Sequence, residues 1–185
     1  MMKIAIISGS PNEKSRINGV IHYAKLKLEQ NGCEVSIIDV YSLPPKDLMH
    51  ANFNSKPILS ANTKVEEAAG IIIASPVYKT TYTGVLKAYI DLLPQKGFKD
   101  KIVAAYFVGG TISNLLSIDY ALKPLLASMG AKCFADNVFA VDNQIERTED
   151  HEQKITFQLS DEVKQRIEAS ALDLISSRVL TKQNR

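Results

Sequence analysis

Apolar residues gather in five continuous runs, and each run ends in residues typical of turns. Short continuous apolar runs are typical of parallel strands that are buried on both faces of a sheet. We therefore expect strands at Ile4–Ile7, Cys33–Tyr41, Ile71–Ala74, Ile102–Val108 and Cys133–Val141.

Between these runs apolar residues recur at the spacing of a helix with one buried face. This predicts helices from Arg16 to Asn31-Gly32, over Ala61–Ala69, from Thr81 or Thr83 to Pro94, over Ser113–Met129, and after a capping Ser160. Three polar stretches do not follow this spacing. They are predicted to be a loop with one helical turn (Lys46–Ser60), an exposed loop or arm (Asp142–Phe157) and a frayed tail (Thr181–Arg185).

Strands that alternate with helices imply an α/β fold, with a parallel sheet, right-handed crossovers and helices on both faces. Ligands of such folds bind beyond the carboxyl ends of the strands. The loops after strands one, three and four should therefore meet there, namely Ser8–Asn18, Ser75–Tyr82 and Gly109–Asn114. These loops are also rich in Gly, Ser, Thr, Pro and Tyr, so composition and topology predict the same site.

The loop Ser8–Asn18 has the features of a phosphate-binding turn. N–H groups at a helix start have no intrahelical partner and carry the positive end of the helix dipole, which stabilises an anion. Further donors are supplied by Ser8, Ser10, Ser15, Arg16 and Asn18. The motifs GxGxxG and GxxxxGK(S/T) are absent, which removes the nucleotide-binding modes that depend on them. The alternative is an ordinary connection between a strand and a helix.

The other two loops suit a planar ligand. Pro76 lacks an N–H and fixes its own φ, so backbone groups around it can face outward, and Tyr78 and Tyr82 could border a ring. Gly109-Gly110-Thr111 lets the backbone approach a ligand closely, because the glycines have no Cβ. Plain turns are the alternative for both loops.

Pro124 interrupts the helical pattern of Ser113–Met129. Because it cannot donate to the carbonyl of Tyr120, the helix either breaks near Lys123 or widens into a π-bulge around Asp119–Lys123. A π-bulge is often found at a functional site, and Tyr120 would lie within it.

Composition sets the remaining limits. The 185 residues suit one domain, and a net charge of +2 is too small to indicate nucleic acid or a membrane surface as a partner, so neither is expected. No signal peptide or membrane span is expected. Cys33 and Cys133 are expected to be reduced packing residues in a cytoplasmic protein, and the alternative is a reactive thiol. No metal-ligand cluster or catalytic triad is evident, which suggests that a cofactor supplies the chemistry.

These stretches resemble the NADPH-dependent FMN reductases of flavodoxin-like fold. The resemblance is carried by Gly9-Ser10-Pro11 with Ser15-Arg16, by Ser75-Pro76-Val77-Tyr78-Lys79 with Tyr82 and Gly84, and by Gly109-Gly110-Thr111. The segment Asp119-Tyr120-Ala121-Leu122-Lys123-Pro124 is similar to the two-component branch, which serves alkanesulfonate monooxygenases. The resemblance implies a three-layer sandwich with five parallel strands in the order 2-1-3-4-5, as a single domain over residues 1–185.

The resemblance also implies a set of roles. The FMN phosphate would be held by Ser10, Ser15, Arg16 and Asn18 and by N–H groups of the helix start such as that of Ile17. The flavin ring would rest on Pro76, Val77, Tyr78 and Lys79, beside Gly109, Gly110 and Thr111. Hydride would pass from NADPH or NADH to FMN, and reduced flavin would reach a partner monooxygenase. A homo-oligomer, dimer or tetramer, is implied, with Tyr120 at its interface near the flavin.

The sequence departs from the family pattern at two positions, and three alternative functions remain. Many relatives have arginine where this chain has Asn12, and sulfonate-linked relatives often have histidine in place of Asn114. FMN affinity and the partner monooxygenase therefore stay open, as does the choice between NADPH and NADH. The rivals are a quinone or azo reductase with bound FMN, a flavodoxin-like electron carrier, and a non-catalytic nucleotide-binding module. Flavodoxins are typically acidic, so the slightly basic charge argues against the carrier.

Overall fold

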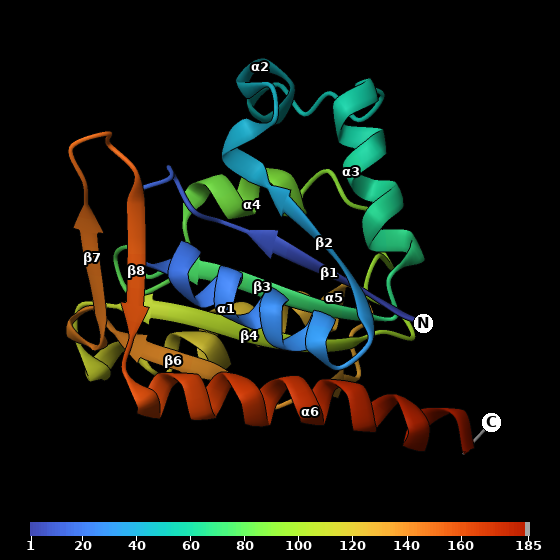
Figure 1. Cartoon of the computed structure of the whole chain (residues 1–185). Coiled ribbons are helices and arrows are strands. Elements are labelled where there is room, and N and C mark those ends of the chain that lie inside the picture. Colours follow the sequence, from blue (N-terminus) through green and yellow to red (C-terminus); the bar gives the residue numbers. More distant parts are fainter. Residues whose placement is uncertain (184–185) are drawn as a thin grey trace.

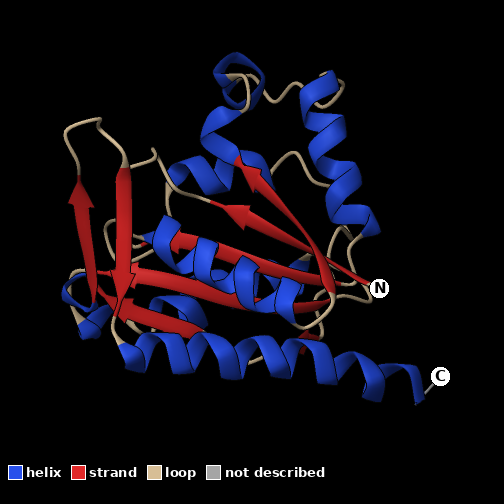
Figure 2. Cartoon of the chain, viewed as in Figure 1, coloured by secondary structure: helices blue, strands red, loops and turns tan. Residues whose placement is uncertain are grey.

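A six-stranded parallel sheet forms the centre of the molecule (Figures 1 and 2). The computed structural model describes residues 1–183. The strands run in the order β2-β1-β3-β4-β5, and β6 also pairs with β4. Their bounds are β1 Met2–Ser8, β2 Cys33–Asp39, β3 Gly70–Pro76, β4 Ile102–Gly109, β5 Cys133–Phe134 and β6 Val138–Val141. The predicted order 2-1-3-4-5 is confirmed.

The predicted fifth strand, Cys133–Val141, is divided in two. Both parts pair with β4, and between them the side-chain oxygen of Asn137 accepts a hydrogen bond from the N–H of Ala105 at 3.2 Å. A side chain thus takes the place of a backbone partner, and pairing resumes at Val138. The prediction of one continuous strand was wrong for this reason.

Helices cover both faces of the sheet. On one side lie α1 (Ile17–Gln30) and α6 (Asp161–Gln183), and on the other α3 (Lys56–Glu67), α4 (Gly84–Ile90) and α5 (Lys123–Ser128). Side chains alternate between the two faces along each strand. In β1, Ile4 and Ile6 join the core under α1 and α6, whereas Ala5 and Ile7 join the other core. This double burial explains the continuous apolar runs.

The region after β2 is more helical than predicted. A 3₁₀ turn η1 (Val40–Ser42) is followed by the short helix α2 (Pro45–Met49), and α3 begins at Lys56 rather than Ala61. Pro57 lies in the first turn of α3, where its missing N–H costs no helical hydrogen bond. The prediction of a loop over Lys46–Ser60 was therefore wrong for the start of α3.

The helical pattern around Pro124 contains a π-helix. A 3₁₀ turn η2 (Ile112–Asn114) leads to the π-helical segment η3 (Ile118–Leu122), and α5 continues from Lys123. Of the two predicted outcomes, the wider turn is confirmed and the break is not. Pro124 sits in the first turn of α5.

The predicted exposed arm is a β-hairpin. After a 3₁₀ turn η4 (Asp142–Gln144), β7 (Ile145–Glu149) pairs in antiparallel fashion with β8 (Ile155–Leu159). Ser160 caps α6, as predicted, by accepting from the N–H of Val163 at 3.4 Å. The predicted frayed tail was wrong for residues 181–183, which belong to α6, and residues 184 and 185 lie outside the described residues.

Within the described residues, every helix is too short or too polar to cross a bilayer.

Candidate functional site

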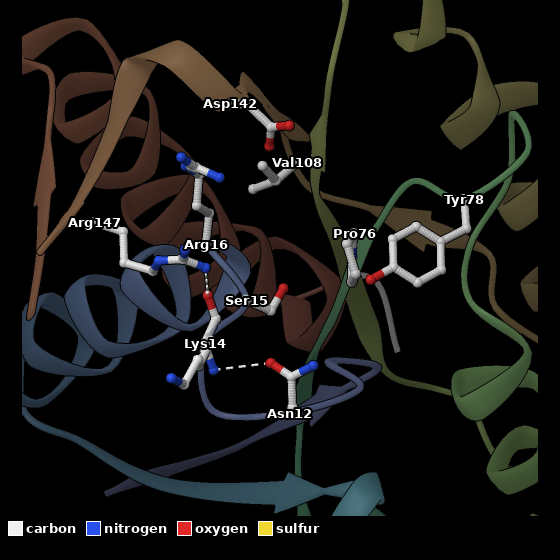
Figure 3. A pocket seen from close by; sticks show the side chains of 9 residues that line it. All are labelled: Asn12, Lys14, Ser15, Arg16, Pro76, Tyr78, Val108, Asp142 and Arg147. Atoms are coloured by element: carbon white, nitrogen blue, oxygen red, sulfur yellow. Dashed lines mark hydrogen bonds between the residues drawn. The ribbon is translucent and has the colours of Figure 1, made fainter. Parts of the chain in front are cut away.

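A cleft of about 540 Å³ opens at the carboxyl ends of β1, β3 and β4. Figure 3 shows the side chains around it, which come from the β1–α1 loop, from β3 and the loop after it, from β4, from η4 and from β7. They are Asn12, Lys14, Ser15, Arg16, Pro76, Tyr78, Val108, Asp142 and Arg147. The loops after β1 and β3 thus meet at this edge of the sheet, as predicted. The sequence-based prediction missed Lys14, Val108, Asp142 and Arg147.

Two of the predicted phosphate donors hold the β1–α1 loop in shape. The Ser10 hydroxyl donates to the carbonyl of Asn12 at 2.6 Å. The Asn18 amide donates to the carbonyls of Asn12 and Glu13, both at 3.0 Å. Ser10, Asn18 and Ile17 are buried, whereas Ser15 and Arg16 line the cleft.

Gly9 lets this loop lie directly against α4. Its N–H donates to the carbonyl of Ala74 at 2.7 Å, and its carbonyl accepts from the Thr83 hydroxyl at 2.7 Å. A Cβ at Gly9 would lie only 2.7 Å from the Cβ of Leu86. The loop is therefore fixed at both its start and its end.

Three cationic side chains line the cleft, but only one has an ionic partner. The Lys14 ammonium contacts Glu149 at 3.0 Å. Arg16 donates through Nε to the carbonyl of Ile145 at 2.9 Å, and Arg147 donates through Nη1 to the carbonyl of Lys14 at 2.8 Å. Among the described residues, neither arginine forms an ion pair. Their charge is available to an anion in the cleft.

The start of α1 adds to this positive field. No acidic residue lies in the first turn of α1, and Arg16 is its N-cap residue. The positive end of the helix dipole is therefore not neutralised by its own helix.

The loop after β3 folds back as a tight turn at the cleft. Tyr78 and Thr81 exchange backbone hydrogen bonds of 2.9 and 3.2 Å. Lys79 and Thr80 between them have φ of 50° and 63°, a left-handed conformation that costs a non-glycine residue about 1 kcal/mol or more. Tyr78 lines the cleft with half its surface exposed, whereas Tyr82 packs against the core.

The two glycines after β4 differ in surroundings. A Cβ at Gly109 would lie 2.9 Å from the Phe139 ring, so this glycine lets β4 pack beside β6. A Cβ at Gly110 would meet only the carboxylate of Asp142, at 3.9 Å. Thr111 accepts from the N–H of Ser113 at 3.3 Å. Val77, Lys79 and Gly109–Thr111 are not among the residues that line the cleft.

Tyr120 lies outside this cleft in the single chain. Its side chain is 80% exposed and stands on the π-helical segment η3. Ile112, Leu115 and Leu116 nearby in the chain are also exposed. We call these four residues the 112–120 patch.

Within the described residues, neither the cysteines nor a metal-ligand cluster gives a second candidate site. Cys33 is buried, Cys133 is half-buried, and neither forms a disulfide. Within the part of the chain that is described, no group of three or more His, Cys, Asp or Glu residues could hold a metal ion.

The comparisons with known proteins agree with this geometry. A family model for NADPH-dependent FMN reductase matches residues 2–146. The FMN reductase (NADPH) of Escherichia coli strain K12 is 38% identical over 144 residues, which are 78% of this chain and 75% of the relative. An FMN-dependent NADPH-azoreductase of Staphylococcus saprophyticus is 31% identical over 120 residues, 61% of this chain and 64% of the relative.

Among solved structures, the apo form of the NADH:FMN oxidoreductase EMOB superposes with a TM-score of 0.84 at 29% identity. The superposition covers 96% of this chain and 90% of that chain. With the family match over most of its length, the chain belongs to the NADPH-dependent FMN reductase family.

Proposed function

We propose that the cleft binds FMN and that the protein catalyses its reduction by NADPH or NADH. The observation that carries this proposal is Arg16, which lines the cleft at the start of α1 and forms no ion pair among the described residues. A phosphate monoester would satisfy both the side-chain donors and the helix dipole.

The residues present fit FMN in size and in chemistry. The cleft volume of about 540 Å³ suits a small organic ligand. We assign the phosphate to Ser15, Arg16 and the N–H groups at the start of α1, with Ser10 and Asn18 holding the loop. The flavin ring would rest on the backbone of Pro76–Lys79, where Val77 donates to the carbonyl of Val108 at 2.8 Å, and beside Gly109, Gly110 and Thr111.

Bound FMN would supply the hydride acceptor, so the protein itself needs no acid, base or nucleophile. What the chain would contribute is position: the residues of the cleft would hold the flavin ring where a second planar ring can meet it. The exposed Tyr78 at the rim and the open space at Gly110 are compatible with a nicotinamide on that face.

Replacing Arg16 by alanine tests the phosphate assignment. The variant should bind FMN about tenfold to a hundredfold more weakly, because a charge-assisted hydrogen bond is lost. Riboflavin has no phosphate, so its binding should change by less than about twofold. Both affinities can be measured by titrating flavin fluorescence. An equal loss for both flavins would contradict the assignment.

We further propose that reduced flavin is released to a flavin-dependent monooxygenase of the alkanesulfonate type. This rests on the similarity of Asp119–Pro124 to the two-component branch and on the π-helix that forms there. A cytoplasmic location and a single domain over residues 1–185 are part of the same proposal.

A second candidate function is reduction of azo compounds or quinones by retained FMN. It is favoured by the similarity to the azoreductase of S. saprophyticus, and the same cleft would serve it. The two candidates differ in whether flavin leaves the protein during turnover.

The 112–120 patch supports a homo-oligomer, dimer or tetramer. Three exposed aliphatic side chains and the exposed Tyr120 lie close in the sequence: Ile112 in η2, Leu115 and Leu116 in the turn after it, and Tyr120 in η3. A second copy of the chain would cover them and could bring Tyr120 near its flavin. Replacing Tyr120 by alanine should raise the amount of retained flavin or alter assembly, and unchanged flavin content and mass would remove its special role.

A further inference from the structure

The β7–β8 hairpin presents one face to the protein and the other to solvent. Residues alternate between the faces of a strand. Ile145, Arg147 and Glu149 share the inner face, and their cross-strand partners are Leu159, Phe157 and Ile155. On the outer face the hydroxyls of Thr148 and Thr156 bond to each other at 2.7 Å.

The hairpin is packed onto the core and is not a free arm. Ile145 and Leu159 are buried in the core under α1 and α6. Phe157 lies against α1 at Gly19, where a Cβ would come within 2.6 Å of the Phe157 Cβ. The backbone that carries Arg147 therefore has a fixed position relative to the β1–α1 loop.

Three contacts join this inner face to the β1–α1 loop. Arg147 donates to the carbonyl of Lys14 at 2.8 Å, and Arg16 donates in the opposite direction to the carbonyl of Ile145 at 2.9 Å. The Lys14 ammonium bonds to both carboxylate oxygens of Glu149, at 3.0 and 3.1 Å. Each guanidinium donates one of its N–H groups in these contacts, and a guanidinium has further donors.

We propose that Arg147 is a second phosphate-binding guanidinium of the cleft and contacts the FMN phosphate together with Arg16. The proposal rests on the proposed function. The family match ends at residue 146, so Arg147 belongs to a part of the chain that the match does not cover. Figure 3 shows the Arg147 side chain directed toward Ser15 and Lys14, on the loop side of the cleft.

The charges around the cleft agree with an anion between the two arginines. Lys14 is neutralised by Glu149, which leaves the charges of Arg16 and Arg147 on the loop side. The one carboxylate of the cleft lining, that of Asp142, lies beside Gly110, at 3.9 Å from where a Cβ of Gly110 would be. In the described residues it forms no ion pair with either arginine.

Binding of FMN and riboflavin to Arg147→Gln tests the proposal, measured by titrating flavin fluorescence. We expect about a tenfold or greater loss of FMN affinity with riboflavin affinity unchanged within about twofold, and partial recovery of FMN binding in Arg147→Lys. Lys154→Gln is the matched control, because it removes the same charge from the same hairpin but not from the cleft lining. It should bind both flavins as the wild type does.

Two results would overturn the role of Arg147. One is wild-type FMN affinity in Arg147→Gln, and the other is an equal loss for FMN and riboflavin, which would reduce Arg147 to a structural contact. Arg16→Ala, measured alongside, separates this inference from the proposed function. If only Arg16→Ala loses its preference for FMN over riboflavin, the role of Arg147 fails alone. If neither variant loses it, the phosphate site itself is wrongly placed.

Discussion

At the scale of single residues, the fixed shape of the β1–α1 loop depends on Gly9. The nearest atoms to a Cβ there belong to Leu86 and Thr83, which start α4 and cannot move without the helix. Gly84, two residues before Leu86, has open space around its Cα.

Gly9→Ala should therefore destabilise the protein by about 1–3 kcal/mol, the usual cost of overpacking. Gly84→Ala, the control, should be neutral or stabilising by up to about 1 kcal/mol, since it replaces a helical glycine. Urea unfolding measures both. A Gly9→Ala protein as stable as the wild type would show that the loop yields easily.

Two buried tyrosines differ in what their hydroxyls contact. The Tyr106 hydroxyl bonds to Ser170 at 3.0 Å, whereas that of Tyr89 has no partner among the described residues. Burial raises the pKa of Tyr106 to about 12 and also raises that of Tyr89.

Tyr106→Phe should cost about 1 kcal/mol, because it leaves Ser170 without this partner, whereas Tyr89→Phe should be neutral or stabilising. The raised folded pKa means that the neutral tyrosine stabilises the fold fully below pH 10, and that this stability is lost as pH rises toward 12. Urea midpoints from pH 8 to 11 should therefore fall less steeply in either variant than in the wild type. An equally steep fall of the urea midpoint with pH in the wild type and both variants would contradict the raised pKa of these tyrosines.

The sequence shows which donors a loop has but not how they are used. Ser10 and Asn18 look like phosphate ligands in the sequence, yet their hydrogens go to the carbonyls of Asn12 and Glu13. Arg147 could not be assigned to the cleft from the sequence, because it lies more than a hundred positions from Arg16. Only the packing of the hairpin brings the two together.

At the scale of elements, the β7–β8 hairpin could not be predicted from apolar alternation in its first strand. The inner face of β7 carries Arg147 and Glu149, so no apolar alternation is visible in that strand. Ile155, Phe157 and Leu159 do alternate with polar residues, and that signal could have identified β8. The parallel strands were found because burial on both faces makes them continuously apolar.

Gly19→Ala tests the packing of hairpin on helix. Alanine normally stabilises a helix relative to glycine by about 1 kcal/mol, but here its Cβ would clash with Phe157. We expect lower stability and faster amide hydrogen exchange over residues 145–159 with little change in the central sheet. Increased stability with unchanged exchange would contradict the packing argument.

At the scale of the whole molecule, the strand order could be predicted because the resemblance and the alternation of elements agree. The sequence could not show that the three loops contribute unequally to the cleft lining, to which β4 contributes Val108 but the glycines after it do not belong. The sequence also could not show which apolar residues remain exposed after folding. The residues of the 112–120 patch are an example.

Leu116→Asp tests whether this patch joins copies of the chain. We expect the wild type to be a dimer or tetramer by light scattering and the variant to be smaller, because a charge would be buried at the interface. Leu172→Asp is the control, since Leu172 is equally exposed but lies on α6, away from the patch. A wild-type monomer, or equal masses for all three proteins, would contradict the oligomer proposal.

The most direct test of the central claim is steady-state oxidation of NADPH and NADH by the purified protein, with and without added FMN. Our account predicts oxidation that requires added FMN and saturates with it, because flavin is bound and released at the cleft in each turnover. A protein that purifies yellow and reduces quinone with no added flavin would contradict it.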